Sequence, residues 1–145
     1  MHISCFGITN FPVDLYEKLY EIELITKSID APTIVKFIGD DLSVTLSVLP
    51  NCNKLEIIPD VVYHYSLGGY TSKYMPYILQ DFISLYQYKQ KMAQKYAMSL
   101  NVQELMDIEL MNILKSYFHM CVKSGGFTEY QLLDEIKTVY NEEII

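Results

Sequence analysis

Apolar residues recur at helical spacing along much of the chain and predict five helices. The last of them has the clearest start. Thr128 and Gln131 form a T-x-x-Q capping box, and Phe127 and Leu132 stand at the two staple positions around it. The predicted helices cover residues 14–27, 40–49, 74–98, 101–123 and 129–145.

Local signals mark the ends of the other predicted helices. Asp14 and Asp40 stand where N-caps belong, and Pro50 closes the second helix. Gly125 and Gly126 follow the fourth helix and supply the left-handed residue that helix ends favour. On the first helix, Leu15, Leu19, Ile22 and Ile25 or their neighbours make one apolar stripe. The fourth runs through an apolar series of Leu105, Ile108, Met111, Ile113, Leu114, Tyr117 and Phe118.

The segment 54–66, KLEIIPDVVYHYS, differs from the rest because it is dense in Ile, Val and Tyr. These residue types favour strands, and Pro59 cannot donate to a strand ladder, so we predict short strands at 55–58 and 61–66. The predicted fold class is therefore α+β and predominantly α-helical. No linker or repeat divides residues 1–145, which we expect to form a single domain.

Charge narrows the range of partners. The chain has 18 acidic and 11 basic residues and a net charge of −7, so it repels polyanions, and we expect neither nucleic acid nor an anionic membrane as a partner. All the basic residues are lysine. Without arginine, the chain has no side chain that binds a phosphate through two parallel hydrogen bonds.

Cysteine and histidine show no metal-binding pattern. Cys5, Cys52 and Cys121 are widely spaced, which is typical of a reduced protein, and the pairs His2 with Cys5 and His119 with Cys121 match no recognised zinc spacing. We therefore expect no metal site in this chain. Neither a signal peptide nor an apolar stretch of about 20 residues occurs, so we expect a soluble cytoplasmic protein without a transmembrane segment.

Two features could carry chemistry. The first is the acidic pair Asp40 and Asp41, which stands at a predicted helix start. The macrodipole stabilises negative charge there, so one carboxylate could accept a proton or hold a cation. The alternative is that Asp40 caps the helix while Asp41 is solvated in the first turn.

The second feature is a glycine turn between tyrosine-rich flanks. Glycines permit positive φ and close backbone approach, and the hydroxyl groups and the lysine beside them suit a sugar or a phosphate. A hairpin or a strand-to-helix turn has the same composition, so both interpretations stay open. The candidate binding residues are Tyr63, Tyr65, Ser66, Gly68, Gly69, Thr71, Ser72 and Lys73.

Taken in order, three blocks of this chain resemble the C-terminal half of a bacterial family 2 glycosyltransferase of the GT-A type, the kind that builds capsular polysaccharides or exopolysaccharides. LYEKLYEIELI resembles the family's KLY helix, FIGDDLSVTLSVLP its GEDL helix, and IIPDVVYHYSLGGYTSKYMP its Y-x-YR-x-GG-x-TSK segment. The order and spacing agree over roughly residues 11–98.

The resemblance implies an inverting transfer of a sugar from a nucleotide sugar to a polysaccharide or lipid-linked acceptor, with Mg or Mn bound at the diphosphate. It makes Asp41 the general base and puts Asp40 in place of the family's Glu. The residues of the glycine turn would bind substrate. It also implies that these residues form the C-terminal portion of a GT-A fold, with a short β segment and three C-terminal helices.

The sequence departs from that family in two places. It contains no D-x-D motif, and Ser66 stands where the family has arginine. We therefore expect the nucleotide-binding half to be missing and the isolated chain to be inactive. The expected partner is that N-terminal half or a second copy of the chain. The alternative function is a non-catalytic α-helical protein-interaction module.

Overall fold

The computed structural model describes residues 18–28, 38–56, 64, 73–96 and 100–141. These residues are predominantly helical, as predicted, and contain no strand. The α-helices are α1 (Ile22–Ser28), α2 (Asp40–Val48), α3 (Ile78–Lys95), α4 (Leu100–Lys123) and α5 (Glu129–Asn141). A single 3-10 turn, η2 (Leu49–Asn51), continues α2 within the described residues.

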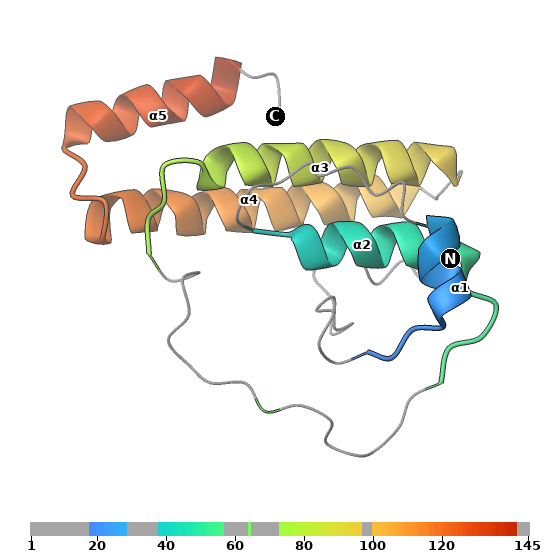
Figure 1. Cartoon of the computed structure of the whole chain (residues 1–145). Helices are drawn as coiled ribbons and strands as arrows, with labels where there is room; N and C mark the ends of the chain where they lie inside the picture. Colours follow the sequence, from blue (N-terminus) through green and yellow to red (C-terminus); the bar gives the residue numbers. More distant parts are fainter. Residues whose placement is uncertain (1–17, 29–37, 57–63, 65–72, 97–99, 142–145) are drawn as a thin grey trace.

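Helices α3 and α4 lie side by side and antiparallel and form the centre of the molecule (Figure 1). Helix α2 packs along α3, and α1 lies at the C-terminal end of α2. Helix α5 turns back from the end of α4 on the side away from α2. None of the described helices combines the length and the apolar character that a membrane span needs.

The core lies where α2, α3 and α4 meet. Helix α4 contributes a side chain at nearly every turn, because its buried residues are spaced by three or four positions, which keeps them on one face. The buried apolar residues of α4 are Val102, Met106, Leu110, Leu114, Tyr117 and Cys121. They pack against Leu42 and Leu46 of α2, and against Ile78, Leu79, Ile83, Leu85, Tyr86 and Met92 of α3.

Polar side chains also link α3 to α4. Lys89, only 3% exposed, forms an ion pair with Glu109. One turn away, the Tyr86 hydroxyl donates a hydrogen bond to Asp107 Oδ1 at 2.5 Å. A buried ammonium group without a partner is costly, so these contacts fix how the two helices align.

The fourth predicted helix is confirmed, but two residues of its apolar series lie on the exposed face. Ile108 and Met111 are 43% and 55% exposed. The stripe that is buried runs through Val102, Met106 and Leu110 instead. Because this helix has apolar residues on two faces, the sequence pattern alone did not select the face that packs against α3.

The first predicted helix is also shorter than expected. Residues 18–21 are not helical and α1 begins at Ile22, while Asp14 and Leu15 lie outside the described residues. Leu19 and Ile22 are exposed rather than buried. Short helices are marginal unless a face packs, so the unpacked first turns do not form.

The start of α3 and the segment after Cys52 also differ from the prediction. Helix α3 begins at Ile78 rather than at residue 74, because Pro76 disfavours the helical conformation at the residue before it. Leu55 and Glu56, predicted to begin a strand, are irregular and exposed. Apart from His64, which is not in a strand, the remaining predicted strand residues lie outside the described ranges.

Candidate functional site

The acidic pair Asp40 and Asp41 directly follows a glycine N-cap, Gly39, rather than containing the cap itself. Gly39 is the N-cap of α2, with φ 94° and ψ 10°, and Asp40 is already the first helical residue. The predicted cap at Asp40 is therefore wrong. A Cβ on Gly39 would lie 2.7 Å from Leu85 Cδ2. Both the left-handed backbone and the close approach of α3 therefore favour glycine at this position.

The turn is held from α3 by a buried carboxylate. Asp81 is 2% exposed, and its Oδ2 accepts a hydrogen bond from the Ile38 backbone N–H at 3.1 Å. Asp81 stands in the first turn of α3, where the macrodipole stabilises its charge. The chain entering α2 is thus attached to a neighbouring helix directly before the acidic pair.

The two predicted catalytic aspartates follow this anchored turn. Asp40 is exposed and Asp41 is partly buried. The first turn is closed by the Ser43 backbone N–H, which donates to the Gly39 carbonyl at 3.0 Å, and by the Ser43 hydroxyl, which donates to the Asp40 carbonyl at 2.7 Å. Two carboxylates at a fixed helix N-terminus, one of them exposed, can accept a proton from a molecule bound there.

The structure locates one residue of the glycine turn. Lys73 is exposed. The other predicted substrate-binding residues lie outside the described ranges: Tyr63, Tyr65, Ser66, Gly68, Gly69, Thr71 and Ser72.

The residue after Lys73 is well anchored. The Tyr74 backbone N–H donates to Ser124 Oγ at 2.9 Å. Its ring packs edge-on against Phe127, with ring centroids 4.9 Å apart. The end of the glycine turn is therefore attached to the connection between α4 and α5.

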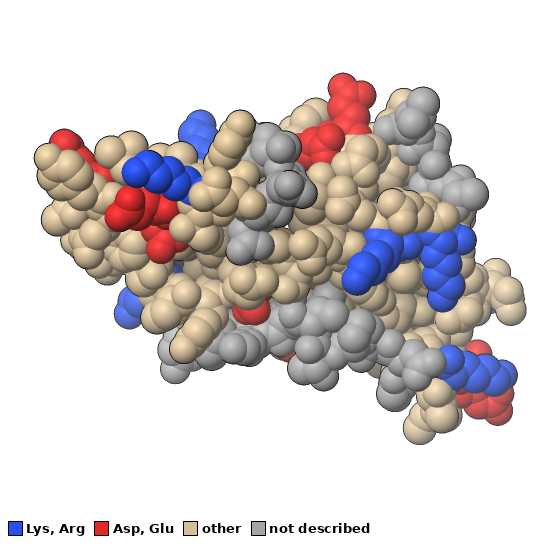
Figure 2. Space-filling model, turned by 90° about the horizontal axis from the view of Figure 1, so that it is seen from above, with Lys and Arg blue, Asp and Glu red and all other residues tan. Residues whose placement is uncertain are grey.

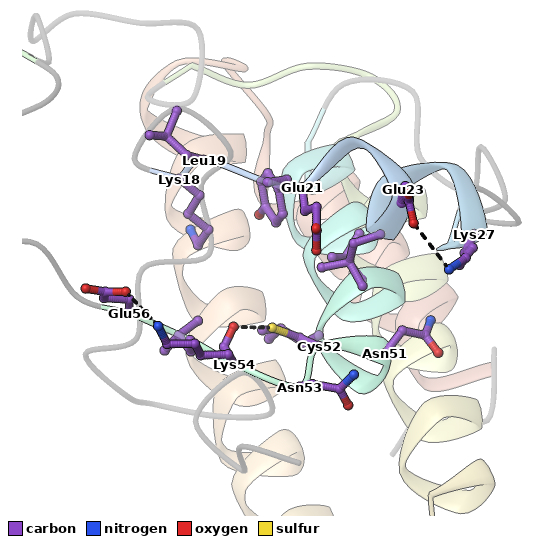
Figure 3. A pocket seen from close by; sticks show the side chains of 15 residues that line it. Lys18, Leu19, Glu21, Glu23, Lys27, Asn51, Cys52, Asn53, Lys54 and Glu56 are labelled. Carbon is purple, nitrogen blue, oxygen red and sulfur yellow. Dashed lines mark hydrogen bonds and ion pairs between the residues drawn. The ribbon is translucent and has the colours of Figure 1, made fainter.

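A pocket of about 790 Å³ lies at the other end of α2 from the acidic pair (Figure 3). It is bounded by residues 18–27 on one side and by residues 48–56 on the other. Sequence reasoning missed it, because its two walls are separate in the chain. The only local sign was the polar turn PNCNK, which begins at Pro50.

The charges around this pocket are balanced. Lys27 lies 3.7 Å from Glu23, and Lys54 lies 3.2 Å from Glu56. Cys52 Sγ donates to the Lys54 carbonyl at 2.9 Å. Because these two lysines are already paired with glutamates, the pocket offers little net attraction for a phosphate. The leucine side chains and the asparagine amides that line the pocket are better suited to contact with an uncharged surface.

Two further titratable side chains, Cys121 and Tyr117, are buried in the core. Burial raises the pKa of the Cys121 thiol, which disfavours the reactive thiolate. Burial also raises the pKa of Tyr117, with Cys121 and Glu135 as hydrogen-bond partners, and its hydroxyl donates to Glu135 Oε2 at 3.0 Å. Among the residues that the structure describes, His, Cys, Asp and Glu form no group of three or more that could hold a metal ion.

Comparison of the chain with models of protein families, with curated proteins and with solved structures gives no match.

Proposed function

We propose that this chain is the acceptor-side half of an inverting family 2 glycosyltransferase, and that its helices form the C-terminal portion of a GT-A fold. The observation that carries the proposal is the anchored turn before α2. Gly39 packs against Leu85, and Asp81 binds the Ile38 backbone N–H at 3.1 Å, so the acidic pair has a fixed position. A catalytic base needs such a fixed position beside its substrate.

In the proposed reaction, Asp41 takes the proton of an acceptor hydroxyl. The hydroxyl oxygen attacks the anomeric carbon of the donor sugar and forms the new glycosidic bond. The bond from that carbon to the nucleoside diphosphate breaks, and its electron pair leaves with the diphosphate. The N-terminus of α2 stabilises the carboxylate form of Asp41 that this step requires. Asp40, which is exposed, lies beside the base.

The donor has to be bound elsewhere. The sequence has neither arginine nor a D-x-D motif. The described side chains also form no metal-binding group. The proposal assigns the Mg or Mn that accompanies a nucleotide sugar to a separate donor-binding half.

Exposed apolar side chains at and beside the pocket support contact with a separate donor-binding half. Leu19 and Leu55 line the pocket and are 92% and 48% exposed, and Ile22 of α1, which does not line it, is 79% exposed. Burying a leucine or isoleucine side chain fully stabilises a protein by roughly 1.5–3 kcal/mol. We assign this surface to contact with the donor-binding half, because its balanced charge and its leucines suit a protein neighbour.

The test is to supply a donor-binding half that carries a D-x-D motif, by fusion or as a second polypeptide. Release of nucleoside diphosphate is then measured with a panel of nucleotide sugars and sugar acceptors. The proposal predicts acceptor-dependent release that requires both halves. Replacing Leu19 and Ile22 with serine should weaken association when the halves are separate, whereas the same changes at exposed Ile108 and Met111 on α4 should not. No sugar transfer from any donor would overturn the proposal.

The alternative is a non-catalytic α-helical interaction module. It is favoured by a second group of exposed apolar side chains on α4: Ile108, Met111 and Val122, which are 43%, 55% and 53% exposed. Patches of this kind mark contact surfaces. Binding of an apolar dye that is lost when Ile108 and Met111 become serine, together with no sugar transfer, would favour this alternative.

A further inference from the structure

Helix α5 has apolar side chains on both its inner and its outer side. On the inner side Val139 is buried, and Leu132 packs against the core. Tyr117 of α4 donates a hydrogen bond to Glu135 of α5. A surface helix ordinarily carries one apolar stripe and a polar opposite face. The outer side of α5 is different, because it exposes Tyr130, Leu133, Ile136 and Tyr140 by 82%, 52%, 41% and 74%.

These four side chains form one outer stripe. At about 100° per residue they fall within an arc of about 120°, and at 1.5 Å per residue the stripe is about 15 Å long. The sequence of residue types along the stripe is nearly symmetric about residue 135. A tyrosine stands at each end, and Leu133 and Ile136 lie between them.

Two oppositely charged side chains lie along one edge of the stripe. Asp134 and Lys137 stand on either side of residue 135, Lys137 Nζ lies 3.6 Å from Asp134 Oδ1, and the two side chains are 78% and 72% exposed. The face of the molecule that includes α5, at the left of Figure 2, carries acidic and basic side chains beside uncharged ones. When a second copy of α5 is placed antiparallel to the first, the acidic residue on this edge of one helix faces the basic residue on the same edge of the other.

We propose that the outer stripe of α5 binds the same stripe of a second copy of this chain, antiparallel and about a two-fold axis near residue 135. A two-fold operation of this kind keeps the same edges of the helices together. It sets Tyr130 opposite Tyr140 of the second copy and Leu133 opposite Ile136 of the second copy. Asp134 then faces Lys137 of the second copy, twice by symmetry.

A second copy fits this surface better than other occupants. A two-fold interface must be complementary to itself, and both the apolar order and the charges of α5 meet that condition. The chain carries a net charge of −7, which disfavours an anionic membrane. The pairing does not depend on the proposed sugar transfer, and it leaves the acidic pair of α2 uncovered, because α5 lies on the opposite side of α3 and α4 from α2.

Sedimentation of the full chain over a range of concentrations tests the pairing. The proposal predicts a concentration-dependent equilibrium between monomer and dimer, which Leu133→Asp abolishes. Met111→Asp on α4 is the matched control, since Met111 is 55% exposed and Leu133 is 52% exposed, and it should leave the dimer intact. Circular dichroism should show unchanged helix content in both variants. A chain that stays monomeric at every concentration overturns the proposal. A monomer that instead binds uncharged lipid vesicles overturns it as well, because the stripe would then contact a membrane. A dimer broken by Met111→Asp but not by Leu133→Asp also overturns it.

Charge reversal tests the antiparallel arrangement without touching the apolar stripe. Asp134→Lys and Lys137→Asp each place like charges opposite one another twice, and each should weaken the dimer by about tenfold. The double variant restores opposite charges and should recover the original affinity. A double variant as weak as the two single variants overturns the antiparallel pairing.

Discussion

Replacing Gly39 with alanine should destabilise the fold at the turn that carries the acidic pair. The φ of 94° at Gly39 costs an L-residue roughly 1–2 kcal/mol. The new Cβ would also lie 2.7 Å from Leu85 Cδ2. Leu85 is 8% exposed, so it has to move within a packed core, which adds about 1–3 kcal/mol. Together the two effects should lower the free energy of unfolding by about 2–5 kcal/mol.

Gly126→Ala separates these two effects. Gly126 also has a positive φ, 66°, but a Cβ there would meet no atom within 4 Å. Its alanine variant should therefore lose only the backbone contribution, about 1–2 kcal/mol. Urea unfolding of both variants measures the difference. If Gly39→Ala is no more destabilising than Gly126→Ala, the close contact between Gly39 and Leu85 does not fix the turn.

Three further predictions concern the core. Lys89→Met leaves Glu109 without its partner and should cost about 3 kcal/mol in urea unfolding, while adding Glu109→Leu should recover most of that loss; an equal loss in both variants would contradict it. Burial, followed by a hydrogen bond to a carboxylate, raises the pKa of Tyr86 from 10.0 to about 12. Between pH 10 and pH 12 the folded state therefore keeps the phenol proton that the unfolded state loses. The stability contribution of this group is fully present below pH 10 and is lost as the pH rises toward 12. Tyr86→Phe should therefore make the free energy of unfolding fall less steeply over this range. An unchanged pH dependence would refute that assignment. A thiol reagent followed by peptide mapping should label Cys52, which is partly exposed, and leave Cys121, which is buried, until the protein unfolds; equal labelling rates would show that α4 and α5 separate readily.

The sequence predicted α5 well because the signal was local. Its capping box is present as expected: Gln131 Oε1 accepts from the Thr128 backbone N–H at 2.9 Å, and the Gln131 N–H donates to Thr128 Oγ1 at 3.4 Å. Gly126 has the positive φ expected of the residue that ends the preceding turn. Such contacts lie within a few residues, so the printed sequence contains both partners.

The errors arise where distant residues decide the structure. The helix start at Gly39 depends on Leu85 and Asp81, which lie more than 40 positions away in the chain. The pocket depends on two segments that meet only in the fold. Position alone identified Asp40 and Asp41 as an acidic pair at a helix start, but it did not identify the turn that holds them.

The rate of sugar transfer by Asp41→Asn, compared with Asp40→Asn in protein joined to a donor-binding half, tests the proposed function most directly. If Asp41 is the base, its asparagine variant should transfer sugar about 10²–10⁴ times more slowly, while Asp40→Asn keeps most of the rate and both variants unfold at similar urea concentrations. An Asp41→Asn protein that transfers sugar as fast as the unchanged protein would contradict the account.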